Sequence, residues 1–493
     1  MKIHLGKTIG FCMFVGLTFF SAKAQDKPAA IEITLDRAIE IALSENPTVK
    51  VADLEIEKKK YAKKSNQSAL YPQIDLVGNY SRAIKKQVMY MGGDDSGGSS
   101  MFDPIIKGIE DTFTESVPGY TPNSLLQNIG KNSTQGGDGG IEVGRDNTWT
   151  GGVSASWPII VPTLWKSLQL SSIDVELAVE NARASKINMV NSIRKAFYGA
   201  LLAKDVLNVY KQSYDNALFN YNNIKSKFEQ GIVSEYDMIR ADVNAKNIKP
   251  NLVQSENAYT LSKLSLKALM GIDIDQEIEI EGSLADYEKE LYQEVLAMDT
   301  TLTRNSDLKQ FDIQTEQLNK SLEIYKAQYL PVISLSGNYM YMSMNNDFKF
   351  GDYKWTPYST VEVAISIPIF DGLKKRNDIK QTKVSLEQMK WQREDIVRNL
   401  KLSVNNDINN MTNYVEQVFS TKDVVVQAQK GYEISKKLYD TGMGTLLDMN
   451  DAQLGLTQAS LAFNQAIYNF LASKSDLDKT LGIDPGIIMD NNK

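Results

Sequence analysis

The chain has 493 residues, with 54 Lys and Arg against 61 Asp and Glu, and it contains one Cys and one His. Both Cys12 and His4 lie in a stretch typical of a secretory signal, with a basic start, a short apolar run over residues 9–20 and an Ala-Lys-Ala cleavage site at 22–24. The apolar run is too short to cross a bilayer as a helix. We therefore expect a signal peptide over residues 1–24.

The expected mature chain has neither His nor Cys, and its net charge changes from −7 to −10 because the signal removes three lysines and no acid. This composition excludes zinc sites built on Cys and His, disulfides, His-dependent nucleophilic catalysis and a Cys-based lipid anchor. An acidic balance without a basic block argues against nucleic-acid binding. No carboxylate pair or Ser–Lys pair lies in a recognisable pocket motif, so we expect no enzyme, no metal site and no cofactor.

The sequence contains an internal repeat. Residues 47–80 align without a gap onto residues 306–339 at an offset of 259. Further along, the Gly-Ile-Asp of 271–273 pairs with that of 482–484 at an offset of 211. Several matches in one register indicate a duplicated architecture.

The change in offset places an insertion in the first half of the chain. Pro158 pairs with Pro368 at an offset of 210, so an insertion of 49 residues lies between Tyr80 and Pro158. We interpret its Gly-rich runs at 92–100 and 136–140 as parts of a flexible surface loop, with a plug, a lid, a partner-docking loop or a Ca²⁺ site as alternatives. The expected divisions are the signal peptide 1–24, a first structural repeat 25–283 with a Gly-rich inserted loop 82–147, a second structural repeat 284–484 and a polar C-terminal tail 485–493.

In chain order, each half predicts a helix, a strand, a loop, a strand, a very long helix, a turn and a helix. Residues 35–70 are helical in composition, and Pro72 closes them. Four segments alternate apolar and polar residues, and each has about nine or ten residues, the length of a tilted membrane-spanning strand. These predicted strands are residues 73–81, 148–157, 332–341 and 359–367.

Two segments, Thr163–Gly231 and Leu373–Gly442, contain no helix breaker except single glycines. Each could form a helix of about 65–70 residues, roughly 100 Å long. A seven-residue spacing of apolar residues predicts that each helix packs along a partner helix. The positions in this spacing are Ile193, Ala200, Leu207, Tyr214, Tyr221 and Phe228 in the first half, and Val397, Val404, Met411, Val418, Val425, Tyr432 and Tyr439 in the second.

Four strands in a membrane cannot remain an open sheet. Lipid offers no hydrogen-bond partner to the edge strands, so each unpaired backbone group costs several kcal/mol. The smallest known closed barrels have about eight strands. The sheet must therefore close into a barrel with further copies of the same chain. The residues are compatible with a barrel of two copies or of three.

The order of elements, the tandem halves and the turns GIVSEYD (231–237) and GMGTLLD (442–448) resemble the TolC-type outer-membrane efflux family over about residues 31–484. The resemblance implies a mainly α fold with a β-barrel part: a tandem-repeat α-helical barrel of long coiled-coil helices joined to a trimer-closed 12-stranded transmembrane β-barrel. It implies a homotrimer in the lipid of the cell outer membrane, extending into the periplasm. Its implied function is a passive exit duct of a tripartite efflux or type I secretion system, working with a periplasmic adaptor protein and an inner-membrane pump.

The resemblance places the two helix–turn–helix turns at the periplasmic tip, which adaptors of the family grip. It implies six adaptor-docking residues, although the same residues are also those that a turn requires. These docking candidates are Gly231, Val233, Ser234, Gly442, Thr445 and Leu446.

Asp448 and Asp451 lie on one helix face just beyond the second turn. The resemblance implies that they line a constricted entrance, together with Asp237 from the first turn and the aromatic Tyr439. Like charges around a threefold axis are then expected to raise the pKa of the aspartates. The alternative is an ordinary helix N-terminus, where Asp is favoured by the helix dipole. Where family members often carry a latching Arg, this sequence has Gly444.

The main alternative function is a soluble periplasmic coiled-coil scaffold or adaptor. The four alternating strands argue against it, because a scaffold does not need them.

Overall fold

The computed structural model describes residues 31–89, 141–292 and 301–483. The predicted signal peptide, the Gly-rich runs of the inserted loop and the tail 485–493 lie outside these residues. The described residues form two compact units. The helical unit comprises those within 1–57, 176–313 and 390–493, and the sheet unit comprises those within 58–175 and 314–389.

The sheet unit contains a four-stranded antiparallel sheet with the strand order β2-β5-β7-β8. Its strands are β2 (Gln73–Arg82), β5 (Asn147–Ile160), β7 (Val332–Asn345) and β8 (Thr356–Ser366), and they confirm the four predicted strands. The central strands β5 and β7 have 14 residues each, longer than predicted, because their mutual pairing continues to Asn147 opposite Asn345. The apolar alternation fades before that end, so the sequence did not reveal it.

A short antiparallel pair of strands, β3 (Gln87–Met89) and β4 (Ile141–Val143), was not predicted. On the chain that leads from β7 to β8 lies the single 3₁₀ turn η3 (Phe350–Asp352).

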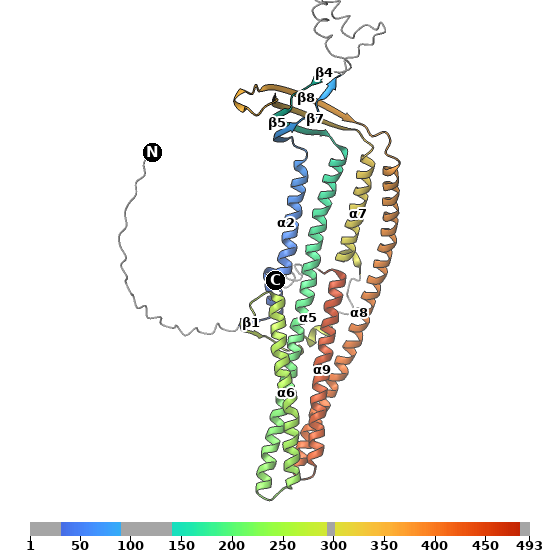
Figure 1. The fold of residues 1–493 in the computed structure, drawn as a ribbon. Helices are drawn as coiled ribbons and strands as arrows, with labels where there is room; N and C mark the ends of the chain where they lie inside the picture. The colour runs from blue at the N-terminus through green and yellow to red at the C-terminus, as the bar shows by residue number, and fades with distance from the viewer. Residues whose placement is uncertain (1–30, 90–140, 293–300, 484–493) are drawn as a thin grey trace, which may run out of the picture. The chain divides into compact units, whose positions relative to one another are not determined.

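Two very long helices have the predicted extent. Helix α5 (Pro162–Glu229) has 68 residues and α8 (Lys374–Asp440) has 67. Short turns join α5 to α6 (Glu235–Met270) and α8 to α9 (Leu446–Leu481) (Figure 1). Among the helices of the described residues, none combines the length and the apolar character of a membrane-spanning helix.

The predicted packing of the seven-residue pattern is confirmed by the burial of its side chains. Tyr432 is buried, as are five other positions of the pattern, and the remaining positions are partly buried. The buried ones besides Tyr432 are Ile193, Ala200, Val404, Met411 and Val418. A polar contact lies beside these apolar residues. Arg194 on α5 forms an ion pair with Asp478 on α9 at 2.6 Å, and both side chains are largely buried.

The predicted single helix over 35–70 is wrong in one respect. The segment forms α1 (Leu35–Glu45) and α2 (Pro47–Ser68), and Asn46 between them is extended, with φ −63° and ψ 127°. A residue before proline is sterically pushed out of the helical region, so Pro47 begins a new helix. The corresponding helix of the second half is α7 (Ser306–Ala327).

The helical unit also contains a small parallel sheet that was not predicted. Strand β1 (Ile31–Ile33) pairs with β6 (Ile278–Ile280), and the 3₁₀ segments η1 (Leu284–Tyr292) and η2 (Leu302–Arg304) follow. Ile33, Ile280 and Leu284 are fully buried in the main apolar core. These three-residue strands are too short for an alternation pattern to be recognised.

Candidate functional site

The first turn of the helical unit has a glycine-dependent helix end. Gly231 has φ +74°, and its N–H donates to the carbonyl of Phe228 at 2.8 Å. The N–H of Ile232 donates to the carbonyl of Lys227 at 2.9 Å, which completes a Schellman-type end. The left-handed backbone at this position favours Gly over any residue with a Cβ.

Helix α6 then begins at a side-chain cap. Ser234 is the N-cap, and its Oγ accepts the N–H of Asp237 at 3.1 Å. The same Oγ donates to Oδ2 of Asp237 at 2.7 Å. Ser234 and Asp237, predicted for docking and for the entrance, therefore both stabilise the start of the helix.

The second turn repeats this design. Gly442 has φ +79°, and the N–H of Met443 donates to the carbonyl of Leu438 at 2.9 Å. Thr445 and Asp448 form a complete capping box: Oγ1 of Thr445 accepts the N–H of Asp448 at 3.1 Å, and Asp448 Oδ2 accepts the N–H of Thr445 at 3.2 Å.

A small apolar cluster, here called the tip cluster, lies behind both turns. Its buried members are Ile224, Ala241, Tyr432, Leu446 and Met449. Val233 and Tyr439 pack against it and are partly buried. Because Leu446 is only 4 % exposed, this predicted docking residue joins the two helical hairpins inside the chain.

Other apolar side chains of the turns face outward. Ile232 is 65 % exposed and Met443 is 74 % exposed, each directly after the left-handed glycine. Tyr236 and Leu447 are exposed beside them. The sequence prediction missed these residues, although an apolar residue following the glycine of a polar turn is a signal that could have found them.

The two aspartates of α9 differ in their surroundings. The hydroxyl and the N–H of Thr445 both donate to Asp448, and these hydrogen bonds lower the pKa of its carboxyl below the usual value. This direction is opposite to the rise expected from neighbouring like charges, because the capping box stabilises the ionised form within one chain. Asp451 is exposed and one turn further along.

Tyr439 lies partly buried at the end of α8. Burial raises the pKa of its hydroxyl, and the charges of Asp237 and Asp440 raise it further. Nζ of Lys227 lies 5.4 Å from the centre of its ring. Of the predicted entrance residues, Tyr439 therefore contacts Lys227 at the end of α5, and the negative charge of Asp237 acts on the Tyr439 hydroxyl within one chain.

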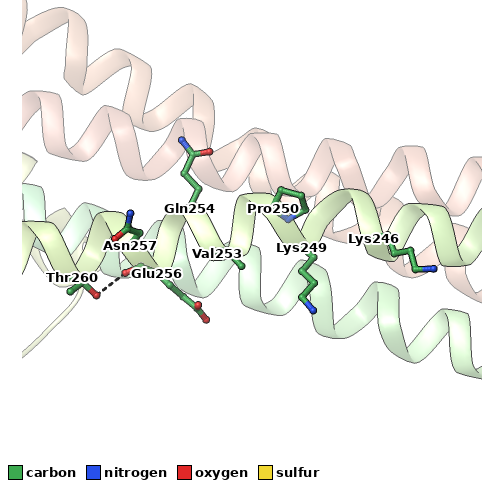
Figure 2. Close-up of a pocket in the computed structure, with 8 residues that line it drawn as sticks. All are labelled: Lys246, Lys249, Pro250, Val253, Gln254, Glu256, Asn257 and Thr260. Atoms are coloured by element: carbon green, nitrogen blue, oxygen red, sulfur yellow. Dashed lines mark hydrogen bonds between the residues drawn. The ribbon is translucent and has the colours of Figure 1, made fainter.

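Hollows lie along the helices of the described chain. Figure 2 shows one, of about 850 Å³, whose lining residues all belong to α6 around Pro250. A proline inside a helix lacks the N–H that would bond four residues back. No group of His, Cys, Asp and Glu side chains suited to a metal ion occurs among the residues that the structure describes.

A second hollow, of about 480 Å³, lies between α5, α8 and α9 and is lined mostly by polar side chains. Gln453, which is 4 % exposed, donates from Nε2 to the carbonyl of Ser213 at 2.7 Å. Oγ1 of Thr457 lies 3.2 Å from Oγ of Ser213. This polar layer separates the tip cluster from the main apolar core of the unit.

Comparisons with known proteins find outer membrane efflux proteins among the relatives of this chain. The family model described as outer membrane efflux protein matches residues 124–272 and 297–483. The outer membrane protein TolC of Vibrio cholerae is 19 % identical over 338 residues, which cover 67 % of this chain and 76 % of TolC. A probable efflux pump outer membrane protein of Pseudomonas putida, TtgC, is 24 % identical over 377 residues, covering 73 % of this chain and 74 % of TtgC.

Solved structures show the same fold. The Campylobacter jejuni CmeC outer membrane channel has a TM-score of 0.66 at 18 % identity and covers 99 % of this chain and 97 % of CmeC. The Vibrio cholerae outer membrane protein VceC has a TM-score of 0.65 at 14 % identity and covers 91 % of this chain and 96 % of VceC. With its long helices, four-stranded sheet and two capped turns, the chain belongs to the outer membrane efflux protein family, a family of efflux channels located in the outer membrane.

Proposed function

We propose that this protein is the homotrimeric exit duct of a tripartite efflux or type I secretion system. In this function, the sheet crosses the outer membrane and the helices extend into the periplasm. One observation carries the proposal: among the described residues, the edge strands β2 and β8 each have one side without a strand partner, and one face of the sheet is largely apolar and exposed. Neither feature suits a scaffold in water, and both suit a barrel wall in lipid.

The free edges are those of β2 and β8. Each successive pair of strands is antiparallel, so β2 and β8 run in opposite directions. The edge of β8 in one copy can therefore pair with the edge of β2 in the next as a further antiparallel ladder. Three copies make a barrel of twelve strands with room for a lumen, whereas two make a barrel of about eight whose interior side chains fill.

The apolar face supplies the outer wall of this barrel. Leu76 is 86 % exposed, Val361 is 80 % exposed and Ile74 is 71 % exposed in the single chain. The register of the ladders brings these side chains to the same face as Val153 and Leu335. Burial of such a face in lipid removes apolar surface from water at about 25 cal/mol per Å².

The two turns supply the contact with a periplasmic adaptor, which in turn joins an inner-membrane pump. We assign docking to Gly231, Val233, Ser234, Gly442, Thr445 and Leu446 in two roles. Leu446, with Val233, supports the surface from within the tip cluster, while the glycines and caps set its backbone. The exposed Ile232 and Met443 then offer the apolar contacts.

The entrance of the duct is assigned to Asp448, Asp451, Asp237 and Tyr439. In three copies, these side chains would surround the axis at the ends of the long helices. The ring of Tyr439, whose centre lies 5.4 Å from Nζ of Lys227, joins the end of α8 to the end of α5 and offers a contact that opening must break.

In this proposal the chain consists of two structural repeats, residues 25–283 and 284–484. The support for this division is the element order, since α2-β2-β5-α5-α6 is followed by α7-β7-β8-α8-α9 (Figure 1).

Membrane fractionation with crosslinking tests the proposal. Cysteines placed at the β2 and β8 edges of the full chain are expected to link three copies, and the product should be found in outer membranes as a heat-modifiable trimer. A matched pair on the central strands β5 and β7 should give no link between copies. A soluble monomer would favour the alternative scaffold instead.

A further inference from the structure

The polar face of the sheet carries two charged side chains within the four paired strands. Ser and Thr are its commonest residues, followed by the three Met of β7, and its charged residues are Asp75 on β2 and Glu362 on β8. Both are acids and both are exposed. The same strands place Arg82 on the opposite, apolar face at the far end of β2.

The register places both acids toward the same end of the sheet. Asp75 lies level with Ser154, Asn338 and Thr360 across the ladders. Glu362 lies two positions along β8 from Thr360, level with Ser336. In the sequence, this is the end of β2 that follows α2 and the end of β8 that precedes α8.

The position on edge strands matters because edge strands are where copies meet. Within one sheet, three strand spacings of about 4.8 Å separate β2 from β8. Across a seam between copies, β8 and the next β2 are direct neighbours. The two acids therefore come from opposite sides of each seam and from all three seams of the trimer.

We infer that Asp75 and Glu362 form a carboxylate zone in the barrel lumen, which selects for cations independently of the aspartates at the periplasmic entrance. This inference rests on the proposed trimeric duct and adds an ion-selectivity element to it. Three copies contribute six carboxylates and no basic side chain from the polar face of the strands. Charges of one sign in a narrow passage concentrate counter-ions and repel ions of their own sign.

Cysteine accessibility, measured with two reagents of opposite charge, tests whether the two acidic side chains face the lumen. The expected mature chain has no Cys, so a single introduced Cys reports alone. The full-length protein in planar bilayers would be treated with a negatively charged and with a positively charged methanethiosulfonate. D75C and E362C should react and change the conductance, in opposite directions for the two reagents. The neighbours L76C and V361C, on the apolar face, are the matched controls and should show no change.

Ion selectivity tests the consequence. In a KCl gradient, Asp75→Asn with Glu362→Gln should lower the cation-to-anion permeability ratio by about twofold or more. Asp352→Asn, an exposed acid between β7 and β8, should leave the ratio unchanged. An unchanged ratio in the double variant, or modification of L76C and V361C in place of the acid positions, overturns the inference while the channel stands. A wild-type protein that forms no channel overturns the proposed function as well.

Discussion

Asn46 and Asn305 make the same clamp at equivalent places in the two halves of the chain. Nδ2 of Asn46 donates to the carbonyl of Leu269 at 2.7 Å, and Nδ2 of Asn305 donates to the carbonyl of Thr480 at 2.7 Å. Both side chains are buried, and each ties the start of a helix to the last turn of a distant one. The two asparagines are 259 residues apart, the offset of the repeat.

The clamp should stabilise the helical unit. Asn305→Ala leaves the carbonyl of Thr480 without its donor in a buried place, and such a loss costs about 1–3 kcal/mol. We expect a lower melting temperature of the helical signal in circular dichroism for purified protein. Asn223→Ala, at an exposed position on α5, serves as the control and should melt like the wild type.

Asn46→Ala should have an effect similar to that of Asn305→Ala, since the two clamps share their geometry. If neither substitution lowers the melting temperature, the hydrogen bonds do not contribute to stability.

The long helices and the four-stranded sheet could be predicted because their sequence patterns continue over many residues. A seven-residue period over α5 and α8, and an alternation in four strands, each give many independent positions. The clamp could not be predicted, because a single Asn before a helix satisfies many local needs. Nor could the parallel pairing of Ile31–Ile33 with Ile278–Ile280, since three residues carry no recognisable period.

The site could be predicted only in part. Glycine and cap residues of the two turns are readable, because left-handed backbone and capping have strict residue preferences. The burial of Leu446 and the exposure of Met443 depend on how two hairpins pack, and both residues are apolar in the same short turn. Their different roles therefore become visible only in three dimensions.

Gly152 should be essential for the sheet. A Cβ at this position would lie 2.2 Å from the carbonyl oxygen of Tyr339 and 2.6 Å from Cα of Met340, so the backbone of β7 would have to move. Gly152→Ala is expected to reduce the amount of folded trimer in outer membranes. Gly151→Ala is the matched neighbour, because its nearest atom lies at 3.9 Å, and it should assemble normally. Equal yields of the two variants would contradict the register of β5 and β7.

Different substitutions in the two turns should affect stability and adaptor docking separately. Ile232→Ser with Met443→Ser removes exposed apolar side chains, so we expect an unchanged melting temperature but loss of efflux in cells and of crosslinks to the adaptor. Leu446→Ala creates a cavity in the tip cluster and should cost about 2–5 kcal/mol in stability. Normal efflux by the double serine variant would exclude these residues from docking.

Substitutions of Asp448 and Asp451 should also differ in their effects on stability and conductance, although the two residues share a helix face. Asp451→Asn is expected to change single-channel conductance at neutral pH, because this exposed carboxylate has no role in the cap. Asp448→Asn is expected to lower stability as well, since the capping box uses its ionised carboxyl. Unchanged conductance in the double variant would remove both residues from the entrance.

The pH dependence of stability gives a sharper test of the cap. The folded state lowers the pKa of Asp448, so ionisation favours folding above the unfolded value of about 3.9, and this stabilisation disappears as the pH falls through the lower folded value. The wild type should therefore melt higher than Asp448→Asn at pH 7, and the difference should shrink in acid. If the gap between wild type and Asp448→Asn instead widens in acid, neighbouring like charges outweigh the hydrogen bonds of Thr445 in the assembled protein, and the pKa of Asp448 there is raised.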